Sequence, residues 1–213
     1  MGVTAHRLDS VQLRVLGCLL EKQRTTPDQY PLSLNALRLA CNQATNRDPV
    51  LDLDESTVRE AVQRLGTIGW SRLASGPGSR AAKYRQLFDE ALGLLPSETA
   101  LLAVLMLRGP QTAAELRARS ERLHHFTSVP DVESTLERLV ERELVQRQER
   151  RPGTREERWI HLLGEDSDAA SREPQAEQAE RGPSLEQRLT RVEERLAELE
   201  RALAPRGPDE GRL

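Results

Sequence analysis

Apolar residues recur at helical spacing in three stretches of the first 70 residues. This spacing predicts a helix over residues 10–24, a second short helix capped by Ser33, and a third that begins at Asp54 or Ser56. Residues 25–31, which hold two prolines, form a loop between the first two. The apolar positions on the three helices are Val11, Val15, Leu16, Leu19 and Leu20, then Leu34, Leu37, Leu39 and Ala40, then Val58, Val62, Leu65 and Ile68.

A pattern typical of a β-hairpin follows the third predicted helix. Strands are expected at residues 70–74 and 82–87, joined by the Ser-Gly-Pro-Gly-Ser turn of residues 75–79. Three helices followed by a two-stranded ribbon predict a winged helix-turn-helix.

The same order of elements recurs in the second half of the chain. A helix capped by Ser97 is expected to run to Leu107, and a short helix is expected over residues 112–120. A third helix is expected over residues 130–144, because Pro130 suits a first helical turn. Its inward positions are Val132, Leu136, Leu139 and Val140, and strands at residues 145–149 and 157–163 complete the set.

The two halves also match residue by residue. Residues 77–87 and 152–162 place Pro, Gly, a hydroxyl, Arg, a cation, an aromatic and Leu in register. The third helices agree as well, since Val58, Val62 and Leu65 correspond to Val132, Leu136 and Leu139. This agreement favours an internal repeat over chance similarity of two hairpins. The expected fold is mainly α with small β-hairpins (α+β), built as two tandem winged-helix domains over residues 1–92 and 93–164.

The composition changes after the second predicted domain. Residues 165–183 are polar and acidic, so they are expected to form a disordered linker. Residues 184–204 carry an a/d heptad pattern that predicts a coiled-coil helix, followed by a tail over residues 205–213. The seam could pair two copies of the chain or fold back on the domains as an amphipathic helix. Its apolar positions, the candidate dimerisation residues, are Leu185, Leu189, Val192, Leu196, Leu199 and Leu203.

Composition and charge limit the class of protein. Apolar residues make up 37 % of the chain and charged residues 31 %, which fits two small domains with a polar tail. The net charge of -3 argues against a non-specific nucleic-acid binder, so any basic patch must be local. Without a signal-peptide pattern or an apolar run of membrane-spanning length, we expect a cytoplasmic protein that does not enter a membrane.

No group of residues has a spacing that would support catalysis or metal binding. Cys18 and Cys41 fall in apolar helical patterns and are expected to be core residues in a reducing compartment. His124 and His125 are adjacent, so their side chains point apart, and no third ligand is near in sequence. There is no nucleophile elbow, phosphate loop or dinucleotide motif. We therefore expect no enzyme activity, no cofactor and no metal.

Charge distinguishes the two predicted domains. The third helix of the first, residues 54–69, has two arginines and three acidic residues, whereas residues 130–144 of the second have two arginines and five acidic residues. The first hairpin has no acidic residue between positions 71 and 86, and arginines at a wing tip can lie on phosphates. An ordinary solvated hairpin is the alternative. The candidate nucleic-acid contacts are Arg59, Gln63, Arg64, Arg80 and Lys83.

Four stretches of the N-terminal half carry a family resemblance. They are residues 15–23, 25–37, 40–43 and 46–50, and the Thr-Thr-Pro-Asp-Gln-Tyr-Pro motif of residues 25–31 is the most specific part. Over residues 9–163 the chain resembles the bacterial YceH family, and the resemblance is not extended to the heptad tail. It implies a tandem winged-helix fold and no particular biochemical activity. The loop of residues 25–30 is expected to close the first core, with a docking surface for another protein as the alternative.

Two functions remain open at this point. The first is a DNA-binding regulator or chromosome-associated factor that contacts double-stranded DNA through its first domain, with the coiled coil forming a homodimer. The second is an adaptor that binds a protein partner and no nucleic acid. DNA binding would be favoured if the first wing, Arg47 and residues 22–24 form one continuous basic face. The adaptor would be favoured if other parts of the chain cover the third helices.

Overall fold

The helices begin where the sequence supplies polar caps. In the computed structural model, which describes residues 7–74, 82–148 and 157–165, α1 (Ser10–Thr25) starts after Asp9, whose carboxylate accepts the Gln12 N–H at 2.7 Å. The same kind of cap begins α2 (Leu34–Cys41), α3 (Glu55–Thr67), α6 (Ala113–Ser120) and α7 (Val129–Glu141), after Ser33, Asp54, Thr112 and Ser128. Each cap satisfies an N–H that has no partner within its helix.

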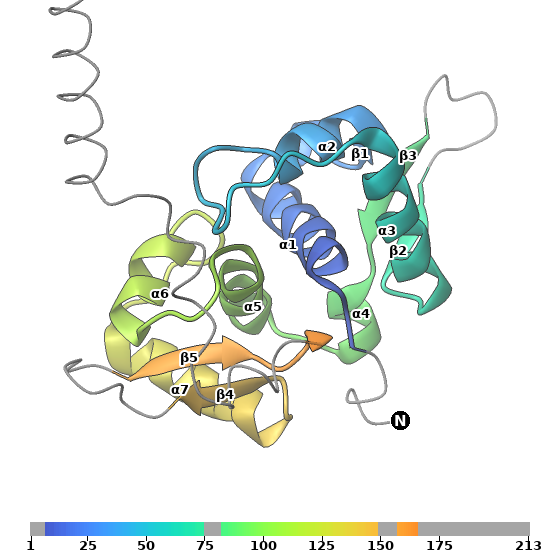
Figure 1. Cartoon of the computed structure of the whole chain (residues 1–213). Coiled ribbons are helices and arrows are strands. Elements are labelled where there is room, and N and C mark those ends of the chain that lie inside the picture. Colours follow the sequence, from blue (N-terminus) through green and yellow to red (C-terminus); the bar gives the residue numbers. More distant parts are fainter. Residues whose placement is uncertain (1–6, 75–81, 149–156, 166–213) are drawn as a thin grey trace, which may run out of the picture. The chain divides into compact units, whose positions relative to one another are not determined.

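The architecture is mainly helical with small antiparallel sheets, an α+β arrangement (Figure 1). Strands β2 (Ser71–Leu73) and β3 (Lys83–Gln86) follow α3, and β4 (Val145–Gln148) and β5 (Arg158–His161) follow α7. The predicted order of three helices and a hairpin is therefore present in both halves. The described residues all belong to one compact unit.

Some predicted helix details were wrong. Helix α5 (Pro96–Arg108) starts after Leu95, whose N–H is accepted by the Glu98 carboxylate at 2.9 Å, so Ser97 is not the cap. Leu39 and Val140 were expected to face inward but are 55 % and 41 % exposed. Both lie at the edge of the apolar face of a short helix, where a small change in helix rotation decides burial.

Three short elements were not predicted. A 3-10 turn, η2 (Pro27–Gln29), lies inside the loop after α1, and α4 (Phe88–Leu92) follows the first hairpin. Strand β1 (Leu32–Ser33) is only two residues long and pairs antiparallel with β3, which gives the sheet order β1-β3-β2. Two residues are too few to show an alternating pattern, so such a strand cannot be recognised from the sequence.

The additional pairing also strengthens the internal repeat. In the first half, Tyr84 of β3 pairs with Leu32, the residue directly before the α2 cap. In the second half, Trp159 of β5 pairs with Gln111, the residue directly before the α6 cap. Tyr84 and Trp159 are the aromatic residues that the sequence places in register, so the halves share a pairing that their sequences alone did not reveal.

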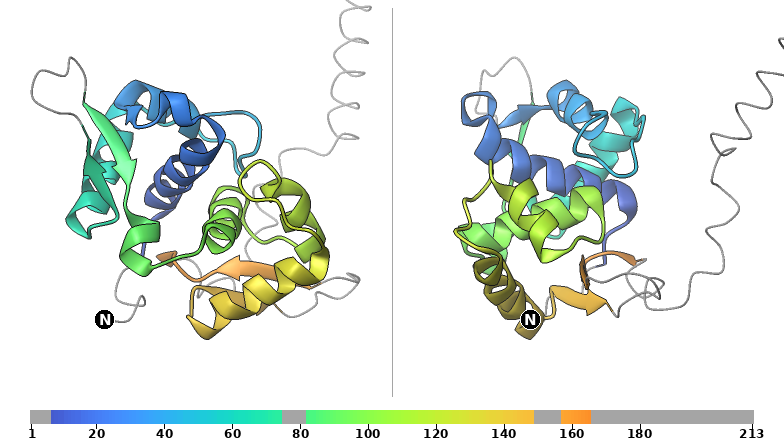
Figure 2. Two further views of the ribbon diagram at one scale, coloured as in Figure 1. Left: turned by 180° about the vertical axis from the view of Figure 1, so that it is seen from behind. Right: turned by 90° about the vertical axis from the view of Figure 1, so that its left-hand side faces the viewer.

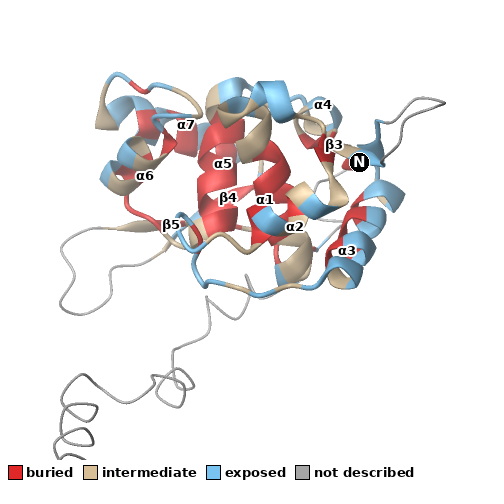
Figure 3. Cartoon of the chain, turned by 90° about the horizontal axis from the view of Figure 1, so that it is seen from above, coloured by how far each residue is buried: buried red, intermediate tan, exposed pale blue. Residues whose placement is uncertain are grey.

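Helices α1 and α5 form the centre of the core (Figure 3). Gly17 allows them to approach closely, since a Cβ at this position would lie 2.9 Å from Cγ of Leu107. Strand β5 also packs against α5 (Figure 2). Close to the N-terminus, the Leu8 N–H donates to the Leu163 carbonyl at 2.8 Å, which attaches the segment before α1 to the segment after β5.

The two cysteines lie in this core, as predicted, and are buried, free and adjacent. The hydrogen bond to the Cys18 thiol, together with burial, raises the pKa of Cys41. The Cys41 thiol therefore stays protonated and behaves as a small apolar side chain.

Candidate nucleic-acid interface

Helix α3 presents a polar face to solvent (Figure 3). Its buried residues Val58, Val62 and Leu65 fix its rotation, and it packs against α1, α2 and β2. Ile68, expected on the same apolar stripe, lies just beyond the helix end and is only partly buried. The exposed face carries the three helical candidates for nucleic-acid contact, Arg59, Gln63 and Arg64.

The two arginines of this face are only weakly held. Arg59 lies 2.7 Å from Glu55, and Arg64 lies 3.7 Å from Glu60 and 3.4 Å from Asp9. The Arg59 and Arg64 side chains are 47 % and 62 % exposed. Exposed pairs one helical turn apart contribute about 0.3–0.5 kcal/mol, so both guanidinium groups can exchange these partners for phosphates at little cost.

The first turn of α3 is negatively charged. The Thr57 N–H and the Ser56 hydroxyl both donate to the Asp54 carboxylate and lower its pKa to about 2. Asp54 is therefore ionised at neutral pH, and together with the acidic residue Glu55 in the first turn it disfavours phosphates at the start of the helix. The part of α3 best suited to a polyanion is its middle and end, from Arg59 to Arg64.

The described part of the first hairpin adds further cations. Arg72 of β2 lies opposite Arg85 of β3, and both are near Lys83, which is exposed and lies opposite Ser33. Arg85 also forms an ion pair with Glu90 of α4. Like charges directly opposite on a sheet repel, and a bound anion would relieve that repulsion. Arg80 lies outside the described residues.

Arg47 does not extend this surface. It is buried, with two guanidinium nitrogens 3.1 and 2.6 Å from the two carboxylate oxygens of Glu21. Lys22 is also engaged, 3.2 Å from Glu21 and 3.2 Å from Gln43. The continuous basic face of the wing, Arg47 and residues 22–24 is therefore absent, because tertiary packing turns Arg47 inward onto α1.

The corresponding helix of the second half is different. With Val58 matched to Val132, Arg59 and Gln63 correspond to Glu133 and Glu137 of α7, and Arg64 corresponds to Arg138. Both glutamates are exposed, and Arg138 lies 3.6 Å from the buried Glu98. Neither third helix is covered by other described residues along this polar face. The same arrangement of elements thus presents a surface of both positive and negative charges on α3 and an acidic surface on α7.

The loop after α1 closes the first core. The Tyr30 hydroxyl accepts the Gln86 N–H of β3 at 2.7 Å, and burial raises the pKa of Tyr30 to about 12. The Gln86 amide in turn donates to Gln23 of α1 at 2.6 Å. The Thr-Thr-Pro-Asp-Gln-Tyr-Pro motif therefore connects the end of α1 to the hairpin, as the connector interpretation expected.

Other candidate chemistry is sparse in the part of the chain that the structure describes. No three His, Cys, Asp or Glu side chains within residues 7–74, 82–148 and 157–165 are arranged to hold a metal ion. His125 contacts Glu121 at 2.6 Å on the surface, and His124 packs edge-on against Phe126. None of the described helices is both long and apolar enough to cross a bilayer. The six heptad positions from Leu185 to Leu203 lie outside the described residues, so the dimer stays a prediction.

Comparison with known proteins identifies the family. A family model described as "Protein of unknown function, DUF480" matches residues 8–154. A UPF0502 protein of Solibacter usitatus is 48 % identical over 196 residues, covering 92 % of this chain and 94 % of that protein. A UPF0502 protein of Pectobacterium carotovorum is 46 % identical over 207 residues (93 % and 97 %), and the UPF0502 protein YceH of Salmonella paratyphi A is 45 % identical over 205 residues (93 % and 95 %).

These alignments also correct the extent of the resemblance. Each covers at least 92 % of this chain, more than residues 1–163 can supply, so the similarity continues into the C-terminal segment. The names of these relatives state no enzymatic activity. Family model and relatives agree over most of the length, and the chain belongs to the YceH (UPF0502, DUF480) family.

Proposed function

We propose that this protein is a non-enzymatic DNA-binding protein of tandem winged-helix architecture, a transcriptional regulator or chromosome-associated factor that contacts DNA through its first domain. The observation that carries the proposal is the exposed polar face of α3, with Arg59, Gln63 and Arg64, in the same small domain as a hairpin rich in cations. The proposed domains are residues 1–92 and 93–164.

The winged-helix assignment rests on topology. In the first half, a short strand precedes the second helix and joins the hairpin in the order β1-β3-β2. In the second half, the Gln111–Trp159 bridge takes the place of β1. A helix-turn-helix places its last helix in the major groove, which gives α3 a defined role in the proposal.

Different residues have different roles in the proposed complex. Gln63 and Arg64 lie toward the end of α3 and are suited to base edges, since glutamine and arginine side chains can make paired hydrogen bonds with bases. Arg59, Lys83 and Arg80 are assigned to phosphates, which fix the register of the protein on the duplex. Pairing of two chains through the heptad residues would present two such domains to two half-sites.

The second domain supports a second candidate function. The exposed face of α7 carries Asp131, Glu133, Glu137 and Glu141, and Val140 is exposed beside them. An acidic helix is repelled by phosphates, so this face suits a basic or apolar protein partner better than DNA. If α3 does not bind DNA either, the whole protein is an adaptor that uses its domains and the heptad helix.

The test is fluorescence anisotropy of a labelled random-sequence duplex, titrated with the full-length protein at several salt concentrations. We expect binding that weakens steeply as salt rises, with each phosphate contact contributing about 0.9 to the slope of log K against log salt. Arg59→Ala should lower that slope by about one, and the double variant Arg80→Glu/Lys83→Glu should lose binding.

The matched control is Arg138→Ala. Arg138 occupies on α7 the position that Arg64 occupies on α3, so it removes one exposed arginine from the domain not assigned to DNA. Its binding curve should overlie that of the wild type, whereas Arg64→Ala should weaken binding. No binding at low salt, or equal losses in Arg64→Ala and Arg138→Ala, would contradict the assignment and favour the adaptor.

A further inference from the structure

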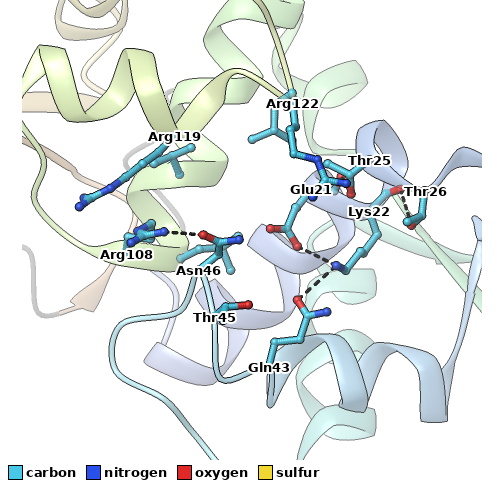
Figure 4. A pocket seen from close by; sticks show the side chains of 13 residues that line it. Glu21, Lys22, Thr25, Thr26, Gln43, Thr45, Asn46, Arg108, Arg119 and Arg122 are labelled. Carbon is cyan, nitrogen blue, oxygen red and sulfur yellow. Dashed lines mark hydrogen bonds and ion pairs between the residues drawn. The ribbon is translucent and has the colours of Figure 1, made fainter.

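A pocket of about 170 Å³ lies where the two halves of the protein meet (Figure 4). The ends of α1, α5 and α6 and the loop between α2 and α3 form its walls. Four cationic side chains line it, namely Lys22, Arg108, Arg119 and Arg122. Glu21 is the one acidic residue that lines this pocket, within the part of the chain that the structure describes.

These cations are not neutralised by the acids around them. The Glu21 carboxylate is held by both terminal nitrogens of buried Arg47, so its charge is already compensated when Lys22 approaches it at 3.2 Å. Arg119 lies 3.4 Å from Glu115, but Glu115 also lies 3.2 Å from Arg158. Two carboxylates are thus shared among four cationic groups.

The two remaining arginines are compensated even less. Arg108 donates to the neutral side-chain oxygen of Asn46 at 2.6 Å. Burial, and then the charge of Arg119, lowers the pKa of Arg108. Arg122 is exposed and has no hydrogen bond or ion pair to any other described residue. Four cations therefore line the pocket with fewer anions to match them, and the charge of Arg119 acts directly on Arg108.

Helix dipoles do not account for this excess. Lys22, Arg108 and Arg119 lie in the last turns of three helices, where cations offset the negative helix end. A helix end carries about half a negative charge, so three ends offset about one and a half of the four cations. Glu21 and Arg47 cancel each other. A net positive charge of about two and a half remains for a ligand to neutralise.

The loop that forms one wall is held in a fixed conformation. Asn46 has a left-handed backbone with φ of 59°, a conformation that asparagine adopts more readily than most residues other than glycine. Its carbonyl accepts from the Arg47 guanidinium at 2.8 Å, and the N–H of Asp48, two residues further on, donates to the Leu107 carbonyl at 2.9 Å. These hydrogen bonds fix the loop that forms this wall of the pocket.

The first-half wall comes from the stretches that carry the family resemblance. Glu21 and Lys22 belong to residues 15–23, Gln43 to residues 40–43 and Asn46 to residues 46–50. The buried members of these stretches, such as Arg47, hold the fold together.

We propose that this pocket binds a small phosphate anion with at least two negative charges, held between Lys22 of the first half and Arg108, Arg119 and Arg122 of the second. Guanidinium groups present planar pairs of N–H donors that match phosphate oxygens, and several of them favour a multiply charged group. The volume admits one or two phosphoryl groups rather than a whole nucleotide, so any larger part of the ligand lies outside the pocket. The site is separate from the α3 face and does not rest on DNA binding.

The experiment is calorimetric titration of the full-length protein with sodium pyrophosphate, with sodium chloride at matched ionic strength as the reference. We expect one site per chain. Arg122→Ala and Arg119→Ala should each weaken binding about 10- to 100-fold, the usual effect of losing hydrogen bonds to a charged group. Because Arg122 is exposed and has no hydrogen bond or ion pair to another described residue, its removal should leave the thermal unfolding midpoint unchanged.

The source of the phosphate is resolved by a second titration with adenosine triphosphate. Tighter binding than pyrophosphate supports the proposal with a nucleotide as the ligand, and equal binding supports it with the phosphoryl groups alone as the recognised part. An unchanged affinity in both arginine variants, or no heat beyond the chloride reference, would overturn the site.

A phosphate group of DNA is the alternative ligand for this pocket. Paired variants distinguish it from a small phosphate anion. Arg59→Ala should leave pyrophosphate binding unchanged, and Arg122→Ala should leave binding of the labelled duplex unchanged. If Arg122→Ala instead loses the duplex, and the duplex displaces pyrophosphate from the wild type, the small-anion proposal is wrong and the pocket is part of the DNA surface. If the wild type binds pyrophosphate but does not bind the duplex, only the proposed function is contradicted.

Discussion

At the scale of single residues, burial gives charged side chains roles that their types do not reveal. Arg14 is buried in α1 and donates to the carbonyls of Cys41 and Pro49, at 3.1 and 2.6 Å. Arg47 is buried against Glu21 and also donates to the Ala40 carbonyl at 3.1 Å. Buried cations need such partners, because an unpaired charge in the interior costs several kcal/mol. Both arginines hold the loop after α2 against α1.

His161 gives the first stability prediction. It is buried at the end of β5, and burial lowers its pKa to about 4 from 6.5. Its Nδ1 has no hydrogen-bond partner among the described residues. Between pH 6.5 and 4 the unfolded chain binds a proton at this position that the folded protein does not. The free energy of unfolding therefore falls as the pH drops through this window, by about 3 kcal/mol in total.

The variant that tests this is His161→Gln. The first half has buried Gln86 at the matching position of its hairpin, so the framework accepts glutamine there. Urea unfolding at pH 7 and at pH 4 should show a loss of stability that is about 3 kcal/mol smaller in the variant than in the wild type. The carboxylates of the protein also titrate in this pH range, but they do so equally in both proteins and do not affect the difference. Identical losses in the two proteins would show that His161 is not held neutral.

At the scale of elements, the short helices were predicted well where caps and apolar spacing agree. Two helices begin at the predicted polar residues, Ser33 and Thr112. The buried stripe of α3 is formed by Val58, Val62 and Leu65, as predicted. The start of α5 was missed because Pro96 and Glu98 compete with Ser97 as local signals. Strand β1 was missed because it exists only through its pairing with β3, in which Leu32 lies opposite Tyr84, 52 residues further along the chain.

The crossing of α1 and α5 predicts opposite effects for two glycine substitutions. In Gly17→Ala the new Cβ would lie 2.9 Å from Cγ of Leu107 and 3.2 Å from Cβ of Met106, in a closely packed core. Overpacking of this kind costs about 1–3 kcal/mol, more than the gain of about 1 kcal/mol from better helix propensity. We expect Gly17→Ala to lower the thermal unfolding midpoint.

The matched substitution is Gly66→Ala in α3. There the new Cβ would meet nothing nearer than 3.6 Å, an ordinary contact, so the gain in helix propensity remains. We expect the free energy of unfolding to rise by up to about 1 kcal/mol. A stabilising Gly17→Ala would mean that the helices can separate slightly at no cost, and that close approach is not required.

At the scale of the whole molecule, the open question is how many chains act together. The six heptad positions between Leu185 and Leu203 predict a helix that pairs two copies. Sedimentation equilibrium of the full-length protein should give a dimer, and Val192→Glu/Leu196→Glu should give a monomer, because two buried acids oppose the seam. Glu194→Gln, at a flanking position, is the control. A monomeric wild type would favour a helix that folds back on its own chain.

The amino-acid sequence by itself determined the α+β class, the order of the main helices and hairpins, most helix limits and the family. Caps, apolar spacing and turn residues act over a few positions, and the two similar halves provided an internal check. Only the tertiary structure decided which residues from distant positions meet. It turned Arg47 inward onto Glu21, placed Cys18 beside Cys41, and brought Lys22 together with Arg108 and Arg119 at one pocket. The packing of α1 on α5 fixes these encounters, and no local pattern encodes the angle and depth at which two helices pack.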